Sequence, residues 1–142
     1  MLNKIKNKKF EGEKIFLKKL TKNDCTKKYL RWLKDKKINQ YLETRWKLYN
    51  KKKLEEFVSY CNKSDSDILF GIFKSKDEHI GNIKIGNLNL NHNSAYISYF
   101  IGEINEWGKG HATEAVKLAL KLSFESLKLF KCYAGVYKKN KS

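Results

Sequence analysis

Apolar residues recur with the period of a helix in several parts of the chain. The clearest case is residues 51–61, where Leu54, Phe57, Val58 and Cys61 lie at positions i, i+3, i+4 and i+7. Three other stretches show helical features: one that begins after the capping residues Thr21 to Asp24 and buries Tyr29, Leu30 and Leu33, a short one around Ile38 to Leu42, and one from about Gly110 to Leu127. The pattern therefore predicts four helices.

Short apolar runs bounded by polar turns predict strands elsewhere in the chain. They cover Ile15 to Leu20, Ile68 to Phe73, His79 to Ile85, Ala95 to Ile101 and Cys132 to Tyr137. Helices and strands that alternate without a linker or an internal repeat predict one α+β domain over residues 15–142. Residues 1–14 are mostly Lys, Asn and Glu with little periodicity, so we expect a loose N-terminal arm there.

The chain is strongly basic, but lysine carries almost all of the charge. Its 142 residues include 31 Lys and Arg against 15 Asp and Glu, a net charge of +16, and only Arg31 and Arg45 are arginines. The 13 Asn and the absence of Pro are what an A/T-biased coding sequence would give, whereas attraction to polyanions or phosphate-bearing ligands is the functional alternative. Because specific recognition of bases and phosphates favours arginine, this composition disfavours a nucleic-acid-binding protein.

The sequence shows no sign of a membrane segment or of a disulfide scaffold. Its apolar runs are too short to cross a bilayer, and no apolar segment of a secretory signal follows the basic start. Cys25, Cys61 and Cys132 are scattered and form no C-x-x-C pair, which predicts neither a disulfide framework nor a zinc site. We therefore expect a cytoplasmic protein without a metal centre.

The most informative segment is residues 106–115, which join a predicted strand to the predicted long helix. Gly108 and Gly110 allow positive φ angles and close approach of a ligand to the backbone. Unpaired N–H groups and the positive end of the helix dipole meet at this point, and Lys109 adds a charge. These features predict a pocket for an anion such as a pyrophosphate. The loop lacks the G-K-[ST] of a P-loop, and Thr113 replaces the third glycine of a dinucleotide-binding loop.

The same loop matches the acetyl-CoA motif Gln/Arg-x-x-Gly-x-Gly/Ala of the GNAT superfamily of N-acetyltransferases, with Trp107 in the Gln/Arg position. Its Trp-Gly-Lys-Gly form, followed by Ala-Thr-Glu-Ala, resembles the subgroup of ribosomal-protein N-terminal and bacterial sugar-modifying acetyltransferases. Further matches are Phe70-Gly71-Ile72, His79-Ile80-Gly81-Asn82-Ile83, Ile97-Ser98-Tyr99-Phe100-Ile101-Gly102, and Ala134-Gly135-Val136-Tyr137 with Asn140 and Ser142. The resemblance runs from about Ile15 to Ser142 and implies a mixed, mostly antiparallel central sheet flanked by helices.

The resemblance also implies acetyl-CoA as co-substrate. The pyrophosphate would rest on the N–H groups of Gly108 to Thr113, the pantetheine arm would lie beside Tyr99 to Gly102, and Asn140 would hydrogen-bond the pantetheine. The implied cofactor-binding residues are Phe100, Ile101, Gly102, Trp107, Gly108, Lys109, Gly110, His111, Ala112, Thr113 and Asn140. Candidate substrate-binding residues, at the place where this fold forms the wall of its acceptor pocket, are Tyr41, Arg45 and Trp46.

The implied reaction is direct attack of a substrate amine on the thioester, which requires a proton acceptor, a polarised thioester oxygen and a proton for the leaving thiolate. Backbone N–H groups near Phe100 to Gly102 are the expected polarising donors. Many relatives have a carboxylate on the strand before the loop, but this strand has no acid until Glu103. Ser98 and Tyr99 are therefore the candidate catalytic residues, as holders of a water chain, and plain strand packing is their alternative role.

The chain departs from the family pattern at its end. It stops at Ser142, whereas relatives continue into another helix and a closing pair of strands, so we expect an open edge on the last strand and pairing with a second copy there. The implied function is acetylation of a small amine, for example an amino sugar. A ribosomal-type protein N-terminal acetyltransferase and an inactive truncated relative acting as a basic binding module are the alternatives. His79, His92 and His111 are expected at the surface or in loops.

Overall fold

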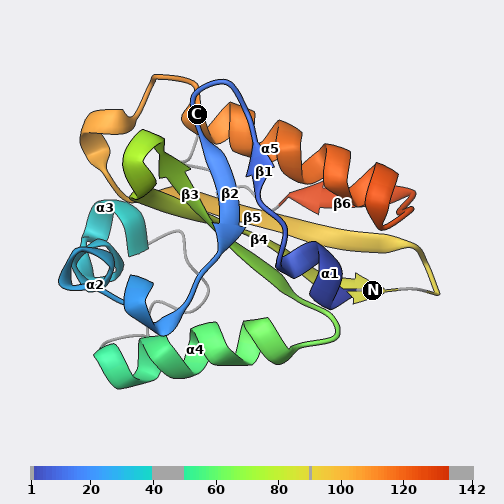
Figure 1. The fold of residues 1–142 in the computed structure, drawn as a ribbon, viewed down its shortest axis with the longest axis horizontal. Helices are drawn as coiled ribbons and strands as arrows, with labels where there is room; N and C mark the ends of the chain where they lie inside the picture. The colour runs from blue at the N-terminus through green and yellow to red at the C-terminus, as the bar shows by residue number, and fades with distance from the viewer. Residues whose placement is uncertain (1, 40–49, 90, 135–142) are drawn as a thin grey trace.

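The computed structural model describes residues 2–39, 50–89 and 91–134, which form one six-stranded sheet with helices on both of its faces (Figure 1). The strands are β1 (Phe10–Glu11), β2 (Phe16–Lys19), β3 (Ile68–Lys74), β4 (Glu78–Asn89), β5 (Ser94–Ile101) and β6 (Lys131–Ala134). The helices are α1 (Leu2–Lys6), α2 (Lys27–Lys34), α3 (Lys36–Asn39), α4 (Lys51–Lys63) and α5 (His111–Lys121), with the shorter turns η1 (Lys22–Asp24), η2 (Ser75–Asp77), η3 (Ile104–Glu106) and η4 (Leu122–Ser126).

Neighbouring strands in this sheet are also neighbours along the chain, in the order β1-β2-β3-β4-β5-β6. All pairs are antiparallel except β5 and β6, which run parallel because α5 crosses between them. The α+β class and the mixed, mostly antiparallel sheet expected from the sequence are confirmed. None of the helices in the described ranges combines the length and the apolar character needed to cross a membrane.

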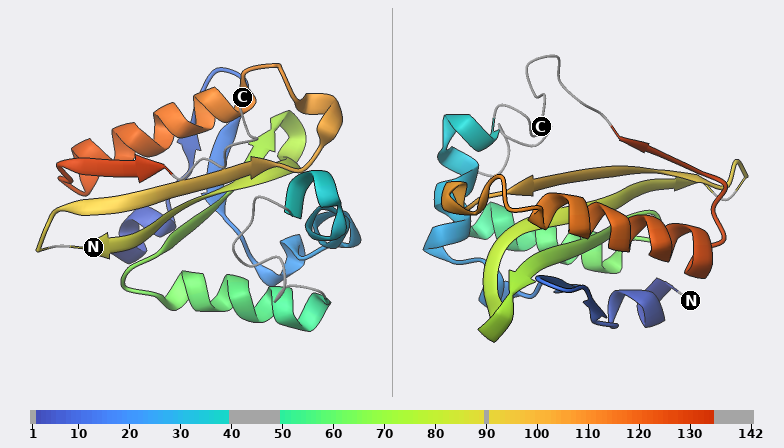
Figure 2. Two further views of the ribbon diagram at one scale, coloured as in Figure 1. Left: turned by 180° about the vertical axis from the view of Figure 1, so that it is seen from behind. Right: turned by 90° about the horizontal axis from the view of Figure 1, so that it is seen from above.

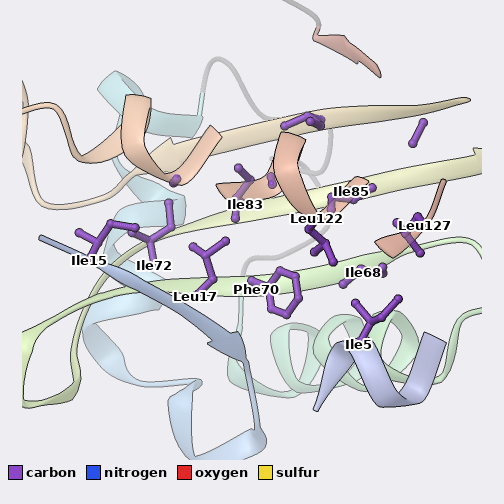
Figure 3. Packing of buried hydrophobic residues seen from close by; sticks show 14 of the residues in the cluster. Ile5, Ile15, Leu17, Ile68, Phe70, Ile72, Ile83, Ile85, Leu122 and Leu127 are labelled. Carbon is purple, nitrogen blue, oxygen red and sulfur yellow. The ribbon is translucent and has the colours of Figure 1, made fainter. Parts of the chain in front are cut away.

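Helices cover both faces of the sheet, so its central strands bury side chains on both sides. α1 and α5 pack on one face (Figure 2), where Phe70 and Ile83 of the sheet (Figure 3) belong to the same buried cluster as Ala115 of α5. α2 and α4 pack on the other face through a second cluster that includes Trp32 and Val58. This arrangement leaves the end of β5 between the two helical layers, next to the start of α5 (Figure 2).

Capping side chains determine where the helices begin. Asn50 caps α4, which begins at the predicted residue Lys51 and continues past the predicted end at Cys61 to Lys63. Thr26 caps α2, because its hydroxyl oxygen accepts a hydrogen bond from the Tyr29 N–H at 3.3 Å. The expected capping residues Thr21 to Asp24 instead close the short turn η1, in which the Thr21 N–H donates to Asp24 Oδ2 at 2.8 Å. The helix therefore begins later than its capping signal indicates.

The first residues are not the loose arm that their composition predicts. They contain α1 and β1, and Ile5 is buried against the sheet (Figure 3). Lys6 is only 3% exposed, and its Nζ donates to the carbonyl oxygens of Cys61 (2.8 Å), Asn62 (3.1 Å) and Ser64 (2.6 Å) at the end of α4. A helix this short is not stable by propensity, so these tertiary contacts hold it.

Two further boundaries differ from those expected. The predicted helix over 110–127 is α5 followed by the π-helical turn η4, in which Phe124 is 43% exposed. β4 continues past the predicted end at Ile85 to Asn89, and Asn89 pairs with Ser94. β6 begins at Lys131 and, in the part of the chain that is described, pairs with β5 alone.

Candidate functional site

The loop between β5 and α5 has a backbone shape that requires its two glycines. Gly108 has a φ of +78° and Gly110 a φ of +85°, both in the left-handed region that other residues avoid. A Cβ atom at either position would meet no atom within 4 Å. The glycines are thus needed for the backbone conformation and not to relieve crowding, and they leave the loop backbone open on this side.

α5 begins with backbone donors that have no acceptor inside the helix. Gly110 provides no capping side chain, and the Glu114 N–H makes the bond back to the Gly110 carbonyl at 3.0 Å. The N–H groups of His111, Ala112 and Thr113 precede that bond, so the first turn offers donors together with the positive end of the helix dipole. This arrangement suits a phosphate or a diphosphate.

Residues just before β2 contact the same turn from the side. Glu114 Oε1 accepts hydrogen bonds from the N–H groups of Lys14 at 2.9 Å and Ile15 at 3.2 Å. Lys14 Nζ in turn donates to the carbonyl oxygen of Lys109 in the loop at 3.2 Å. The position of the loop therefore depends on residues almost a hundred positions earlier in the chain.

Glu106 joins the loop to the sheet. Its Oε1 lies 2.7 Å from Lys74 Nζ at the end of β3, and its Oε2 lies 3.3 Å from Lys109 Nζ and 3.0 Å from His111 Nε2. The side chain is 12% exposed. Hydrogen bonds from Lys74, which have the largest effect, and from His111 and Lys109 lower the pKa of Glu106 to about 2.

This lowered pKa predicts how acid affects the stability of the fold. The pKa of Glu106 falls from 4.5 to about 2 on folding, so the carboxylate stabilises the fold above pH 4.5 and loses that effect as the pH falls toward 2. The melting temperature of Glu106→Gln should be below that of the unmodified protein at pH 7, and the gap should shrink between pH 4.5 and 2. Thermal unfolding across that range measures it, and a gap that is constant with pH would contradict the assignment.

Two histidines lie in places that the sequence did not indicate. His111 was expected at the surface or in a loop, but it is only 5% exposed. Its Nε2 lies 3.0 Å from Glu106 Oε2. His79 is 6% exposed, its Nε2 lies 2.7 Å from Asn82 Oδ1, and burial lowers its pKa. In both cases the partner is reached only through the folded shape. No group of His, Cys, Asp and Glu side chains of the kind that holds a metal ion is present in residues 2–39, 50–89 and 91–134.

The hydrogen-bond alternation along β5 decides which of its last N–H groups face away from β4. The Gly102 N–H donates to the Ile80 carbonyl of β4 at 2.7 Å. Because successive N–H groups of an antiparallel strand point to opposite sides, that of Phe100 also faces β4, whereas those of Tyr99 and Ile101 face the side of β6. The described β5–β6 ladder ends before these two residues. Of the donors expected over 100–102, only Ile101 therefore keeps a suitable direction.

The two candidate catalytic side chains lie on opposite faces of β5. Ser98 shares the face of Phe100, whose ring packs 6.1 Å from that of Trp32 in α2. Tyr99 shares the opposite face with Ile101 and is 39% exposed. The strand thus separates the two hydroxyl groups that we expected to hold one chain of water, and only Ser98 lies on the α2 face.

The other residues expected at the site lie in the loop or outside the described residues. Trp107 contacts the end of β5, because its indole Nε1 donates to the Ile101 carbonyl at 2.7 Å. The remaining loop residues form the open turn described above. Four predicted positions lie outside the described residues, namely Tyr41, Arg45, Trp46 and Asn140.

Sequence reasoning missed three residues that shape the loop: Lys74, Glu106 and Glu114. The spacing of Glu106 and Lys109, three positions apart, was a local signal that indicates an ion pair. Lys74 lies 32 positions before Glu106, so no local pattern connects them.

Comparisons with known proteins agree with this geometry. The model of the family described as "Acetyltransferase (GNAT) domain" matches residues 14–142. Probable N-acetyltransferase YjcK of Bacillus subtilis (strain 168) is 34% identical over 96 residues, which cover 63% of this chain and 50% of that protein. The matched part thus spans half the length of this curated relative.

Solved structures share the fold. An acetyltransferase (GNAT family) from Bacillus anthracis superposes with a TM-score of 0.78 at 18% identity, over 94% of this chain and 76% of that one. The Microcin C7 self immunity acetyltransferase MccE, in complex with acetyl-CoA and AMP, superposes with a TM-score of 0.74 at 20% identity, over 92% and 73%. With the family model covering nearly the whole chain, from the start of β2 through the glycine loop, this chain belongs to the GNAT acetyltransferase domain family.

Proposed function

We propose that this chain transfers an acetyl group from acetyl-CoA to the primary amine of a small acceptor by direct attack on the thioester. The observation that carries the proposal is the open loop of Gly108 and Gly110 at the start of α5. Acetyl-CoA is the co-substrate of GNAT acetyltransferases, and a diphosphate is the ligand that such a loop suits. The strand before the loop supplies two further donors, the N–H groups of Tyr99 and Ile101.

In the proposed reaction the diphosphate rests on the N–H groups of residues 108–113, and the pantetheine arm lies along the end of β5, with Asn140 as a further partner. The Ile101 N–H polarises the thioester oxygen. The amine nitrogen forms a bond to the carbonyl carbon, the carbon–sulfur bond breaks, and the amine loses a proton while the thiolate gains one. Ser98, on the α2 face, holds the water that receives the amine proton.

The charge of α2 and α3 supports an acceptor that is itself anionic. Their exposed basic side chains are Lys27, Arg31, Lys34, Lys36 and Lys37, of which Arg31 lies 3.7 Å from Glu103 Oε1. Asp35 is the sole acidic residue between positions 27 and 39, and it accepts a hydrogen bond from the Lys37 N–H at 2.9 Å. Such a surface attracts a phosphorylated amine and repels a polyamine. Among small amines this favours an amino sugar on a phosphate or nucleotide carrier, with Tyr41, Arg45 and Trp46 in the acceptor pocket.

A panel of acceptors tests the proposal by release of free thiol from acetyl-CoA. We expect turnover with an amino-sugar phosphate or a nucleotide-linked amino sugar, and little with spermidine, because the basic helices select against a polycation. A peptide with a free N-terminus forms the third arm, and preference for it would favour the protein N-terminal alternative. No thiol release with any amine, together with no heat of CoA binding in calorimetry, would leave only the inactive binding module.

We also propose that the edge of β6 opposite β5 pairs with a second copy of the chain. A strand edge with unpaired N–H and carbonyl groups is a template for such pairing, and β6 has β5 as its one partner among the described strands. Sedimentation velocity should show a dimer whose population grows with protein concentration. A monomer at every concentration would contradict this.

A further inference from the structure

The carboxylate of Glu106 occupies an unexpected place in an anion-binding loop. It lies at the entrance of the glycine loop, three residues before Lys109 and five before His111. A negative charge here repels a diphosphate and weakens the pull of Lys109 on it. On electrostatic grounds alone, a loop that binds an anion would bind it better without Glu106.

The contacts of Glu106 show what the carboxylate does instead. Both of its oxygens are in use: Oε1 bonds Lys74 at the end of β3, and Oε2 bonds Lys109 in the loop and His111 at the first position of α5. One side chain thus links the sheet, the loop and the helix. These links span both left-handed glycines, whose freedom would otherwise let the loop take many shapes.

The ammonium groups near Glu106 keep the loop attractive to an anionic ligand. Two ammonium groups, those of Lys74 and Lys109, contact the carboxylate. Lys74 Nζ also lies 3.7 Å from Glu78 Oε2, while Lys14 Nζ, 3.2 Å from the Lys109 carbonyl oxygen, adds a positive charge beside the loop. The Lys109 side chain is more than half exposed, and its Nζ lies 3.3 Å from Glu106 Oε2, which leaves it able to contact an incoming phosphate as well. Glu106 therefore orders the loop without cancelling its charge.

We propose that Glu106 is a positioning residue for the diphosphate of acetyl-CoA, because it holds the loop of Gly108 and Gly110 in its binding shape through Lys74, Lys109 and His111. The proposal rests on the proposed function, which places the diphosphate on this loop. It assigns Glu106 no contact with the ligand and no part in proton transfer.

The sign of the affinity change separates positioning from simple charge. Glu106→Gln removes a negative charge from the site, which by charge alone strengthens binding of CoA. Positioning predicts the reverse, a Kd for CoA that rises roughly tenfold, because an amide cannot hold both ammonium groups. Glu78→Gln is the matched control: Glu78 carries the same charge, lies 3.7 Å from Lys74 Nζ and is more than half exposed. The Kd of Glu78→Gln for CoA should equal that of the unmodified protein or be slightly lower.

A truncated donor shows whether the effect passes through the diphosphate. S-acetylpantetheine has the reactive thioester but no diphosphate, so Glu106→Gln should lower kcat/KM with acetyl-CoA roughly tenfold and leave kcat/KM with S-acetylpantetheine unchanged. Lys74→Met, which removes the anchor of Oε1, should show the same split and serves where Glu106→Gln folds poorly. Both variants are compared with the unmodified protein in one set of titrations.

The possible results are distinct. Tighter or equal CoA binding by Glu106→Gln, or an equal loss with both donors, would overturn the positioning role. An unmodified protein that binds CoA no better than pantetheine would instead remove the diphosphate site itself, and with it both proposals. Loss with acetyl-CoA alone, in both variants, supports the role.

Discussion

Replacement of Gly110 by alanine should raise the Kd for CoA about 5- to 30-fold, because a left-handed φ costs an L-residue about 1–2 kcal/mol. Gly110 has a φ of +85° immediately before α5, and no neighbouring atom would clash with a Cβ there. The cost is therefore one of backbone conformation. We expect the loop of the alanine variant to relieve it by adopting another conformation, in which its N–H groups no longer face the ligand. Calorimetric titration with CoA measures the change.

A series at Gly110 separates conformation from bulk. Asparagine tolerates the left-handed region better than other residues, so Gly110→Asn should bind CoA close to the level of the unmodified protein although it is larger than alanine. Valine, which is β-branched, should be the most damaging of the three. The order Asn, Ala, Val thus follows φ tolerance. A folded Gly110→Val protein that binds CoA normally would show that the loop shape does not matter for the ligand.

The sequence contained the information for the loop because its signals are local. Gly108 and Gly110 indicated positive φ angles in the sequence, and both residues have positive φ angles in the structure. The adjoining helix follows from a run of apolar positions with the right period, and it begins where the glycines end. Local patterns of this kind also predicted α4 and the strands β2, β3, β4 and β5, but not β1.

The parts that sequence reasoning missed are held by contacts between distant segments. Nothing near Glu106 indicates Lys74, since the two meet only when the end of β3 lies beside the loop. The direction of the N–H groups at Tyr99 and Ile101 likewise depends on the register of β5 with β4, which a strand pattern alone does not contain. Residue types near the site were thus predictable, while their partners and directions were not.

The basic composition also has a more specific meaning in the folded protein. Coding bias explains why lysine is frequent, but it does not explain where the ammonium groups lie. Lys6 bonds the end of α4, Lys14 the glycine loop and Lys74 the carboxylate of Glu106. Some of the excess charge therefore maintains the fold and the loop. The exposed remainder on α2 and α3 is what we relate to an anionic acceptor.

Lys6→Met should reduce the free energy of unfolding by about 2–4 kcal/mol, because a charged donor would be lost from three carbonyl groups that stay partly buried. Those carbonyls, from Cys61, Asn62 and Ser64, end α4, where the helix dipole also favours a cation. Burial lowers the pKa of Lys6, and the opposing charge of Asp67 partly offsets that effect. Methionine keeps the length of the side chain and removes only its charge and donors.

Urea unfolding of Lys6→Met and Lys4→Met provides a matched pair, because both residues belong to α1 and only Lys6 is buried. Lys4→Met should change the free energy of unfolding by less than about 0.5 kcal/mol. The free energy of unfolding of Lys6→Gln should lie between those of Lys6→Met and Lys4→Met, since its amide still donates to one or two of the three carbonyls. The test decides between a loose arm and a packed one: if the Lys6 and Lys4 variants were equally stable, the bonds of Lys6 to α4 would contribute nothing to the fold. A large difference between them means instead that the first six residues belong to the domain, and that the basic start of the chain is part of what holds α4 on the sheet.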